Sequence, residues 1–187
     1  VLPLLATQIL WINLVTDSAP ALAMGVDPSV EDVMGRPPRK PEDRVIDATM
    51  WSGVLLLGAV MAVSALATLD VFLPGGLIDI AGLSTDGLPT ARTAAFSTLV
   101  LAQLFNTLNS RSETVSALRH LFVNKWLWGA IALGAVLQVA VVEVPVLQTA
   151  FSTTSLDPAH WAIVVAMASL VLWAGEIRKA VRRARGL

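Results

Sequence analysis

Residues 1–26 read VLPLLATQILWINLVTDSAPALAMGV, an apolar stretch with a single acid, Asp17, in its second half. Sixteen uncharged residues precede Asp17 and nine follow it, so a membrane-spanning helix would place this carboxylate well inside the bilayer. An ionisable side chain at that depth costs about 3 kcal/mol or more. Asp17 is therefore a candidate functional residue rather than an incidental one.

Asn13 and Thr16 lie four and one residues before Asp17, a spacing that puts all three side chains on one face of a helix. Pro20 has no N–H, so the Thr16 carbonyl would lose its helical partner and could face a ligand. These groups form an all-oxygen set on about one turn, which hard cations such as Ca²⁺ prefer. The alternative is a polar contact between helices, and the depth of the acid favours the ion site.

The composition indicates a membrane protein. Of the 187 residues, 55% are hydrophobic and 14% are charged, against about 25% charged residues in an ordinary soluble domain. The 14 acids and 13 bases nearly cancel, so the chain lacks the basic field of a nucleic-acid-binding protein. The absence of cysteine excludes disulfides and thiolate chemistry. No basic region precedes the first apolar run, so we expect no signal peptide and a start within a longer protein.

Five apolar segments predict an all-α fold, a polytopic membrane bundle of five transmembrane helices. We expect these helices at about residues 1–25, 48–72, 93–111, 125–145 and 159–180. A proline-rich loop at 27–47 joins the first two, either as a solvated connector or as a docking surface for a cytoplasmic domain. The lipid bilayer is the expected partner of the bundle surface.

The distribution of bases predicts the orientation in a cell membrane. If the segments alternate in direction, 12 of the 13 Lys and Arg residues lie on one side, and Arg92 lies on the other. The positive-inside rule then places the N-terminus outside and the C-terminus in the cytoplasm. The basic tail at residues 178–185 is expected to contact anionic lipid headgroups.

Three motifs resemble one protein family. QILWINLVTDSAPALAMGVDP at residues 8–28, followed by DVMGRPPRKP at 32–41, resembles the sixth transmembrane helix and following loop of calcium-transporting P-type ATPases of the sarcoplasmic-reticulum type. LAQLFNTLNSRSE at 101–113 is similar to the eighth helix and WAGEIRKAVRR at 173–183 to the tenth. The resemblance implies that residues 1–187 are the C-terminal cation-transporting ATPase transmembrane domain, helices six to ten of a ten-helix, bacterial-like pump.

The resemblance implies an ATP-driven Ca²⁺ exporter as the intact protein. The chain has no DKTGT phosphorylation motif and no Gly-rich nucleotide-binding pattern, so by itself it would not hydrolyse ATP. ATP and Mg²⁺ would be bound by parts absent from this chain. The implied partners are the missing N-terminal helices and cytoplasmic domains of the same pump.

The resemblance also implies ligands. Asn13 and Asp17 match residues that hold one Ca²⁺, and Asp17 would bridge to a second ion that Thr16 helps to hold. The eighth-helix glutamate that completes the second site is matched here by Gln103, whose amide supplies an oxygen but no charge. We therefore expect one Ca²⁺ per cycle. An Mn²⁺-transporting pump of the same family and a standalone membrane scaffold or interaction protein remain alternatives.

Other polar residues are expected to be structural. Asn106, Asn109 and Gln138 are predicted to form hydrogen bonds between helices. Glu176 is predicted to be a salt-bridged acid at the membrane interface.

Overall fold

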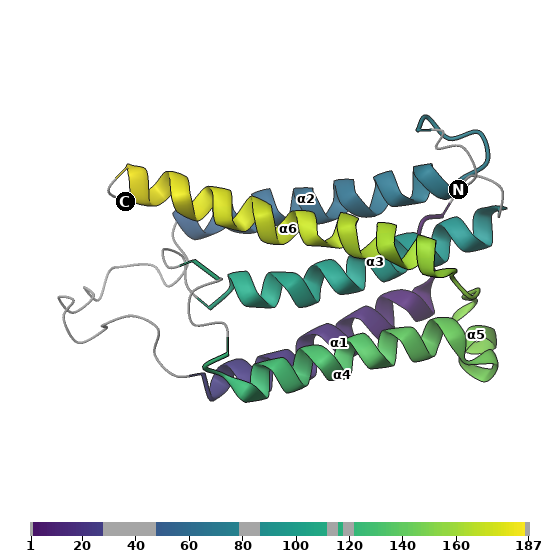
Figure 1. Cartoon of the computed structure of the whole chain (residues 1–187), viewed down its shortest axis with the longest axis horizontal. Coiled ribbons are helices and arrows are strands. Elements are labelled where there is room, and N and C mark those ends of the chain that lie inside the picture. Colours follow the sequence, from purple (N-terminus) through teal and green to yellow (C-terminus); the bar gives the residue numbers. More distant parts are fainter. Residues whose placement is uncertain (1, 28–47, 79–86, 112–115, 118–121, 186–187) are drawn as a thin grey trace.

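The protein is described from a computed structural model that covers residues 2–27, 48–78, 87–111, 116–117 and 122–185, without the side chains of Asp17, Ala48 and Thr49. The described residues form six helices, namely α1 (Ala6–Gly25), α2 (Ala48–Phe72), α3 (Gly87–Asn109), α4 (Lys125–Glu143), α5 (Pro145–Phe151) and α6 (Pro158–Ala184). The five long helices run in alternating directions, and α1, α3 and α6 all end at the end of the bundle that holds the C-terminus (Figure 1). We call this the C-terminal end. The predicted all-α membrane bundle is confirmed.

Helix α3 lies at the centre of the bundle. It packs against α2 and α6 on one side and against α1 and α4 on the other (Figure 1). Helices α2 and α6 also contact each other, as do α1 and α4. Small and hydroxyl-bearing side chains, including Ala91, Ala94, Ser97 and Thr98, are fully buried along α3 and allow its neighbours to approach closely.

The helix bounds differ most from the expectation at four places, of which the first is the start of α1 at Ala6 instead of residue 1. Helix α3 begins at Gly87 instead of residue 93, because the polar residues before 93 are helical although they interrupt the apolar run. Helix α5 was not expected: Pro145 suits its first turn and Ser152, in the left-handed region at φ 51°, follows its end. Helix α6 continues to Ala184, beyond residue 180. The predicted loop at 27–47 lies outside the described residues, apart from Asp27.

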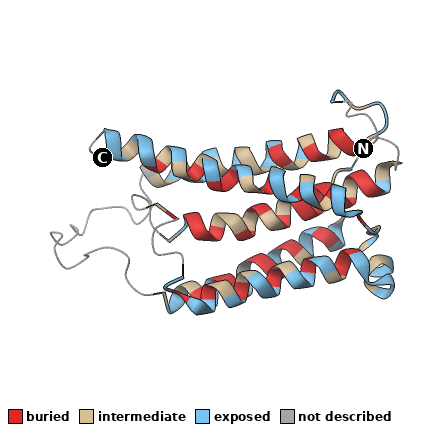
Figure 2. Cartoon of the chain, in the orientation of Figure 1, coloured by how far each residue is buried: buried red, intermediate tan, exposed pale blue. Residues whose placement is uncertain are grey.

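Many of the exposed residues of the bundle, whose positions Figure 2 shows, are large and apolar. Helices α2, α4 and α6 are long and apolar enough to cross a membrane. Helix α2 turns large side chains outward, and Trp51, Val54, Leu55 and Val63 are each more than half exposed. A surface of this kind is stable in contact with lipid and not with water. The chain is part of a multi-pass membrane protein.

Gln138 of α4 connects three helices near the middle of the bundle. The side chain is fully buried; its Oε1 accepts a hydrogen bond from Trp11 Nε1 of α1 at 3.1 Å, and its Nε2 donates to Ser97 Oγ of α3 at 3.0 Å. The prediction that Gln138 links helices is confirmed. Each such bond contributes about 0.6 kcal/mol on average in a membrane bundle.

A polar cluster joins three helices at the C-terminal end, and we call it the Asp27 clamp. The Asp27 carboxylate accepts hydrogen bonds from Arg111 Nε at 2.9 Å and Nη2 at 3.1 Å, and from Asn124 Nδ2 at 2.9 Å. Asn124 also donates to the Ala23 carbonyl and caps α4 by accepting from the Leu127 N–H. The clamp therefore connects the end of α1 with the end of α3 and the start of α4.

Asn109 and Gly175 fix the contact between α3 and α6. Asn109 Nδ2 donates to the Val171 carbonyl at 3.0 Å, which confirms the predicted link between helices. The Asn109 amide occupies the space that a Cβ on Gly175 would need. Only glycine at position 175 therefore leaves this amide in place.

Gly175→Ala should destabilise the bundle by about 1–2 kcal/mol, because the displaced Asn109 amide loses its bond and is left buried. Gly129→Ala is a matched control, since its Cβ would meet no atom within 4 Å and alanine is the better helix former. Unfolding of the purified chain in detergent, followed by circular dichroism, measures both changes. Equal stabilities for the two variants would contradict the packing described for Asn109.

Candidate cation site

A cleft of about 470 Å³ opens between α1, α2 and α3. Its lining combines oxygen-bearing side chains with apolar ones: Thr16, Pro20, Ala21, Met24, Met61, Gln103, Asn106, Thr107 and Ser110. Thr16 comes from α1, whereas Gln103 and Asn106 lie one turn apart on α3. The contact between α1 and α3 thus brings two of the sequence-predicted site residues, Thr16 and Gln103, to the same cleft.

Thr16 lies one turn before Pro20 in α1, where the proline interrupts the helical hydrogen bonding. The Thr16 side chain is buried, and its hydroxyl donates a hydrogen bond to the Ile12 carbonyl one turn earlier, at 2.7 Å. This bond uses the hydroxyl hydrogen and leaves the oxygen free to act as a ligand. Pro20 lies within the helix and has no N–H to donate to the Thr16 carbonyl. The Thr16 carbonyl oxygen is therefore a second oxygen of Thr16 without its helical partner.

Two amide oxygens in the cleft lack hydrogen bonds. Gln103 Oε1 and Asn106 Oδ1 are both buried and have no partner among the described residues. A buried acceptor without a partner costs about 1–3 kcal/mol, and such groups usually face a ligand, an ion or water. The bond between helices that was predicted for Asn106 is not formed by this oxygen. In the sequence, the signal that Asn106 lines the cleft was its i+3 spacing from Gln103, which places both residues on one stripe of α3.

Asn13 stands apart from this cleft. The Asn13 side chain is exposed on the surface of the described bundle and does not line the cleft. Asp17 belongs to α1, but its side chain lies outside the part of the chain that the structure describes. The described bundle therefore does not bring Asn13 together with Gln103.

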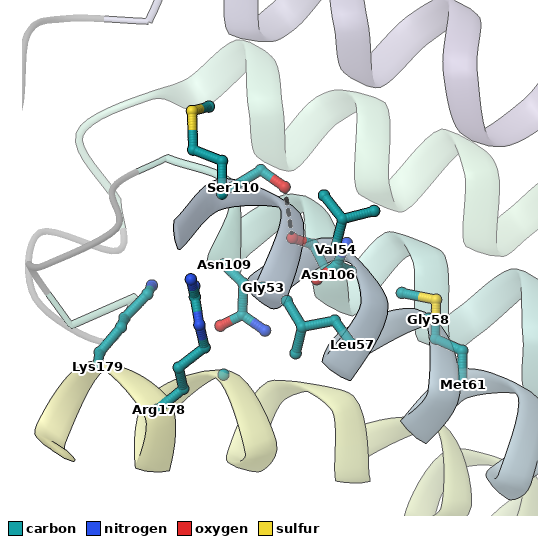
Figure 3. Close-up of a pocket in the computed structure, with 12 residues that line it drawn as sticks. Gly53, Val54, Leu57, Gly58, Met61, Asn106, Asn109, Ser110, Arg178 and Lys179 are labelled. Atoms are coloured by element: carbon teal, nitrogen blue, oxygen red, sulfur yellow. Dashed lines mark hydrogen bonds between the residues drawn. The ribbon is translucent and has the colours of Figure 1, made fainter. Parts of the chain in front are cut away.

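A second cavity, of about 420 Å³, lies between α2, α3 and α6 towards the C-terminal end. Figure 3 shows the Asn106 and Asn109 side chains approaching it from α3 and Arg178 and Lys179 from α6. Asn106 lines both this cavity and the cleft. Polar side chains of α3 thus continue from the cleft towards the C-terminal end.

Glu176 lies on α6 near this cavity. Its carboxylate accepts a hydrogen bond from the Ala117 N–H at 2.6 Å and another from Ser116 Oγ. Lys179 Nζ, which is buried, lies 3.6 Å from Glu176 Oε1. The predicted salt bridge of Glu176 is confirmed, and it attaches residues 116–117 to α6.

The polar side chains that line the cleft are all neutral oxygen donors: Thr16, Gln103, Asn106, Thr107 and Ser110. Within the described ranges no three His, Cys, Asp or Glu side chains gather into a metal-binding group. Hydroxyl, amide and carbonyl oxygens suit hard cations, but a dication in a low-dielectric site also needs negative charge.

Comparison with known proteins identifies the family. Residues 1–181 match the family model described as "Cation transporting ATPase, C-terminus". A calcium-transporting ATPase of Bacillus subtilis (strain 168) is 38% identical over 90% of this chain, and calcium-transporting ATPase 1 of Schizosaccharomyces pombe is 35% identical over 99%. Calcium-transporting ATPase type 2C member 2 of Mus musculus is 34% identical over 95% of the chain.

These alignments cover 18%, 20% and 18% of the three relatives, so the chain spans about a fifth of their length. The family match, by contrast, extends over almost all of the chain and includes both sides of the cleft. The chain therefore belongs to the cation-transporting ATPase family, and it matches the C-terminal part of that family.

Proposed function

We propose that this chain supplies the ion-binding membrane part of an ATP-driven pump that exports Ca²⁺. The observation that carries the proposal is the meeting of Thr16, Gln103 and Asn106 in one cleft, where two buried amide oxygens have no hydrogen-bond partner in the described structure. The relatives named above as calcium-transporting ATPases support Ca²⁺ as the transported ion.

In this proposal, Asn13, Thr16 and Asp17 coordinate Ca²⁺ in mid-membrane, and Gln103 adds a neutral oxygen. Asp17 supplies the negative charge that the described cleft lacks. Ca²⁺ takes about six to eight oxygen ligands, more than these residues provide. The exposed face of α1 that carries Asn13 would meet the remaining membrane helices of the pump, which would bring further ligands.

The energy for transport would come from ATP and Mg²⁺ bound by domains outside this chain. Membership of the pump family favours this function over the alternative of a standalone scaffold protein. Because both Ca²⁺ and Mn²⁺ accept oxygen ligands, the ligand types do not choose between them, and a measurement is needed. The ATPase activity of the intact pump as a function of each ion tests this choice, and we expect Ca²⁺ to activate at the lower concentration.

Asp17→Asn should abolish Ca²⁺-activated phosphoenzyme formation in the intact pump. The substitution keeps the size of the side chain but removes its charge, and we expect Ca²⁺ affinity to fall by about a hundredfold or more, which corresponds to about 3 kcal/mol. Asn13→Ala should weaken binding less, because only a neutral dipole is lost. Asp157→Asn makes the same charge change on an exposed residue before α6 and should leave activation unchanged. Normal activation of Asp17→Asn would refute the site.

Calcium binding should saturate at one ion per pump. A second ion would bring the charge to +4 beside few acids, and the neutral amide of Gln103 does little to offset the repulsion. Equilibrium binding of radioactive Ca²⁺ to the intact pump measures the number of ions. Gln103→Ala should change the affinity much less than Asp17→Asn does. Two bound ions, one of which is lost in Gln103→Ala, would show instead that an amide suffices for a second site.

The orientation is tested by cysteine labelling. With the N-terminus outside and the C-terminus in the cytoplasm, an impermeant external reagent should label Thr85→Cys in intact cells and spare Arg39→Cys and Arg119→Cys. These three positions lie outside the described residues and were chosen only by their place between helices. Permeabilised cells, in which all three should react, provide the control. External labelling of Arg39→Cys would show the opposite orientation, with the N-terminus in the cytoplasm.

A further inference from the structure

Gly134 of α4 lies where α1 and α3 both approach this helix. A Cβ on Gly134 would lie 3.0 Å from Leu104 Cδ2 of α3 and 3.4 Å from Val15 Cγ1 of α1. Both side chains are buried, since Leu104 is 3% and Val15 is 6% exposed. They occupy the space in front of the Gly134 backbone, where any other residue would place its own side chain.

The two residues that contact Gly134 are neighbours of the cation site in the sequence. Val15 immediately precedes Thr16, and Leu104 immediately follows Gln103. Thr16 and Gln103 line the cleft between α1, α2 and α3, and no residue of α4 is among the described residues that line it. Helix α4 packs against both α1 and α3. Gly134 therefore contacts both walls of the cleft from outside it.

A side chain at position 134 would displace these two walls. An added Cβ would meet Leu104 at less than the ordinary carbon–carbon contact of about 3.5–4.0 Å, so Leu104 would have to move by a few tenths of an ångström. Val15 is β-branched and has one strongly preferred rotamer in a helix, so it does not readily turn aside for a larger residue. Because packed interiors transmit such shifts, the displacement would reach the backbones that carry Thr16 and Gln103.

We propose that Gly134 is a positioning residue that sets the width of the cation cleft and thereby the size of the ion that the cleft prefers. The proposal rests on the function proposed above, because it takes Thr16 and Gln103 as ligands. Misplacing a group in a preorganised site by about 1 Å can cost about a hundredfold, so a shift of a few tenths of an ångström corresponds to about fivefold. Sr²⁺ has the charge of Ca²⁺ and a larger radius, so a wider cleft favours Sr²⁺.

The test measures the ratio of Sr²⁺ affinity to Ca²⁺ affinity in the intact pump, by displacement of radioactive Ca²⁺ at equilibrium. Gly134→Ala should raise this ratio about fivefold, and Gly134→Val should raise it further. Gly129→Ala is the matched control, because it adds the same methyl group to the same helix where no atom lies within 4 Å, and it should keep the ratio of the parent pump. A loss of folded protein lowers the number of sites and leaves the ratio unchanged, so the ratio separates positioning from stability.

A compensating substitution tests the contact itself. Leu104→Val removes the Cδ atoms that the new Cβ would meet, so Gly134→Ala combined with Leu104→Val should return the ratio to within about twofold of that of the parent pump. An unchanged ratio in Gly134→Ala, an equal change in Gly129→Ala, or no return in the combined variant would overturn the proposal. If the parent pump has no saturable Ca²⁺ site, the proposed function fails and this inference fails with it. That result is distinct from a saturable site whose ratio does not respond to position 134.

Discussion

Polar groups inside a membrane bundle need partners, and the enclosed position of α3 determines which of them have one. Ser97 bonds to Gln138 of α4, Thr98 to Thr68 of α2, and Asn109 to the Val171 carbonyl of α6. One helix is thus attached to three neighbours by hydrogen bonds that lipid cannot replace. Gln103 and Asn106 lie between these levels, and their amide oxygens have no hydrogen-bond partner among the described residues, as is also the case for Asn109 Oδ1. The side chains that bond to neighbouring helices build the frame, and Gln103 and Asn106 line the cleft.

The same frame holds α1, which carries the other side of the cleft. Trp11 is bonded to Gln138 on one side of Thr16 along the helix, and the Asp27 clamp holds the helix end on the other. Gly134 of α4 lets Leu104 and Val15 approach the α4 backbone between these two levels. Thr16 is therefore fixed relative to Gln103 by contacts above and below it. A ligand set positioned in this way loses little conformational entropy when an ion binds.

The long apolar runs were sufficient to predict a bundle of five long helices, because helices satisfy their own backbone in lipid. The apolar runs did not predict the start of α3 at Gly87 or the short helix that begins at Pro145, since neither lies in an apolar run. Gln138 and Asn109 were predicted as links between helices, and both are. The spacing of Asn13, Thr16 and Asp17 predicted a shared helix face, but spacing does not reveal which neighbour covers that face. Asn13 is accordingly exposed, while Asn106, interpreted as a structural residue, lines the cleft.

The Asp27 clamp has a mechanical consequence. Asp27 is the last described residue before the segment 28–47, and its carboxylate is also bonded to Arg111 and Asn124, just beyond α3 and just before α4. A displacement applied to that segment would therefore act on three helix termini together and would not simply unwind the last turn of α1. A force on that segment would thus reach α1, α3 and α4 together, including the helices that carry Thr16 and Gln103. The segment is therefore joined to the bundle through three helix ends and not through α1 alone.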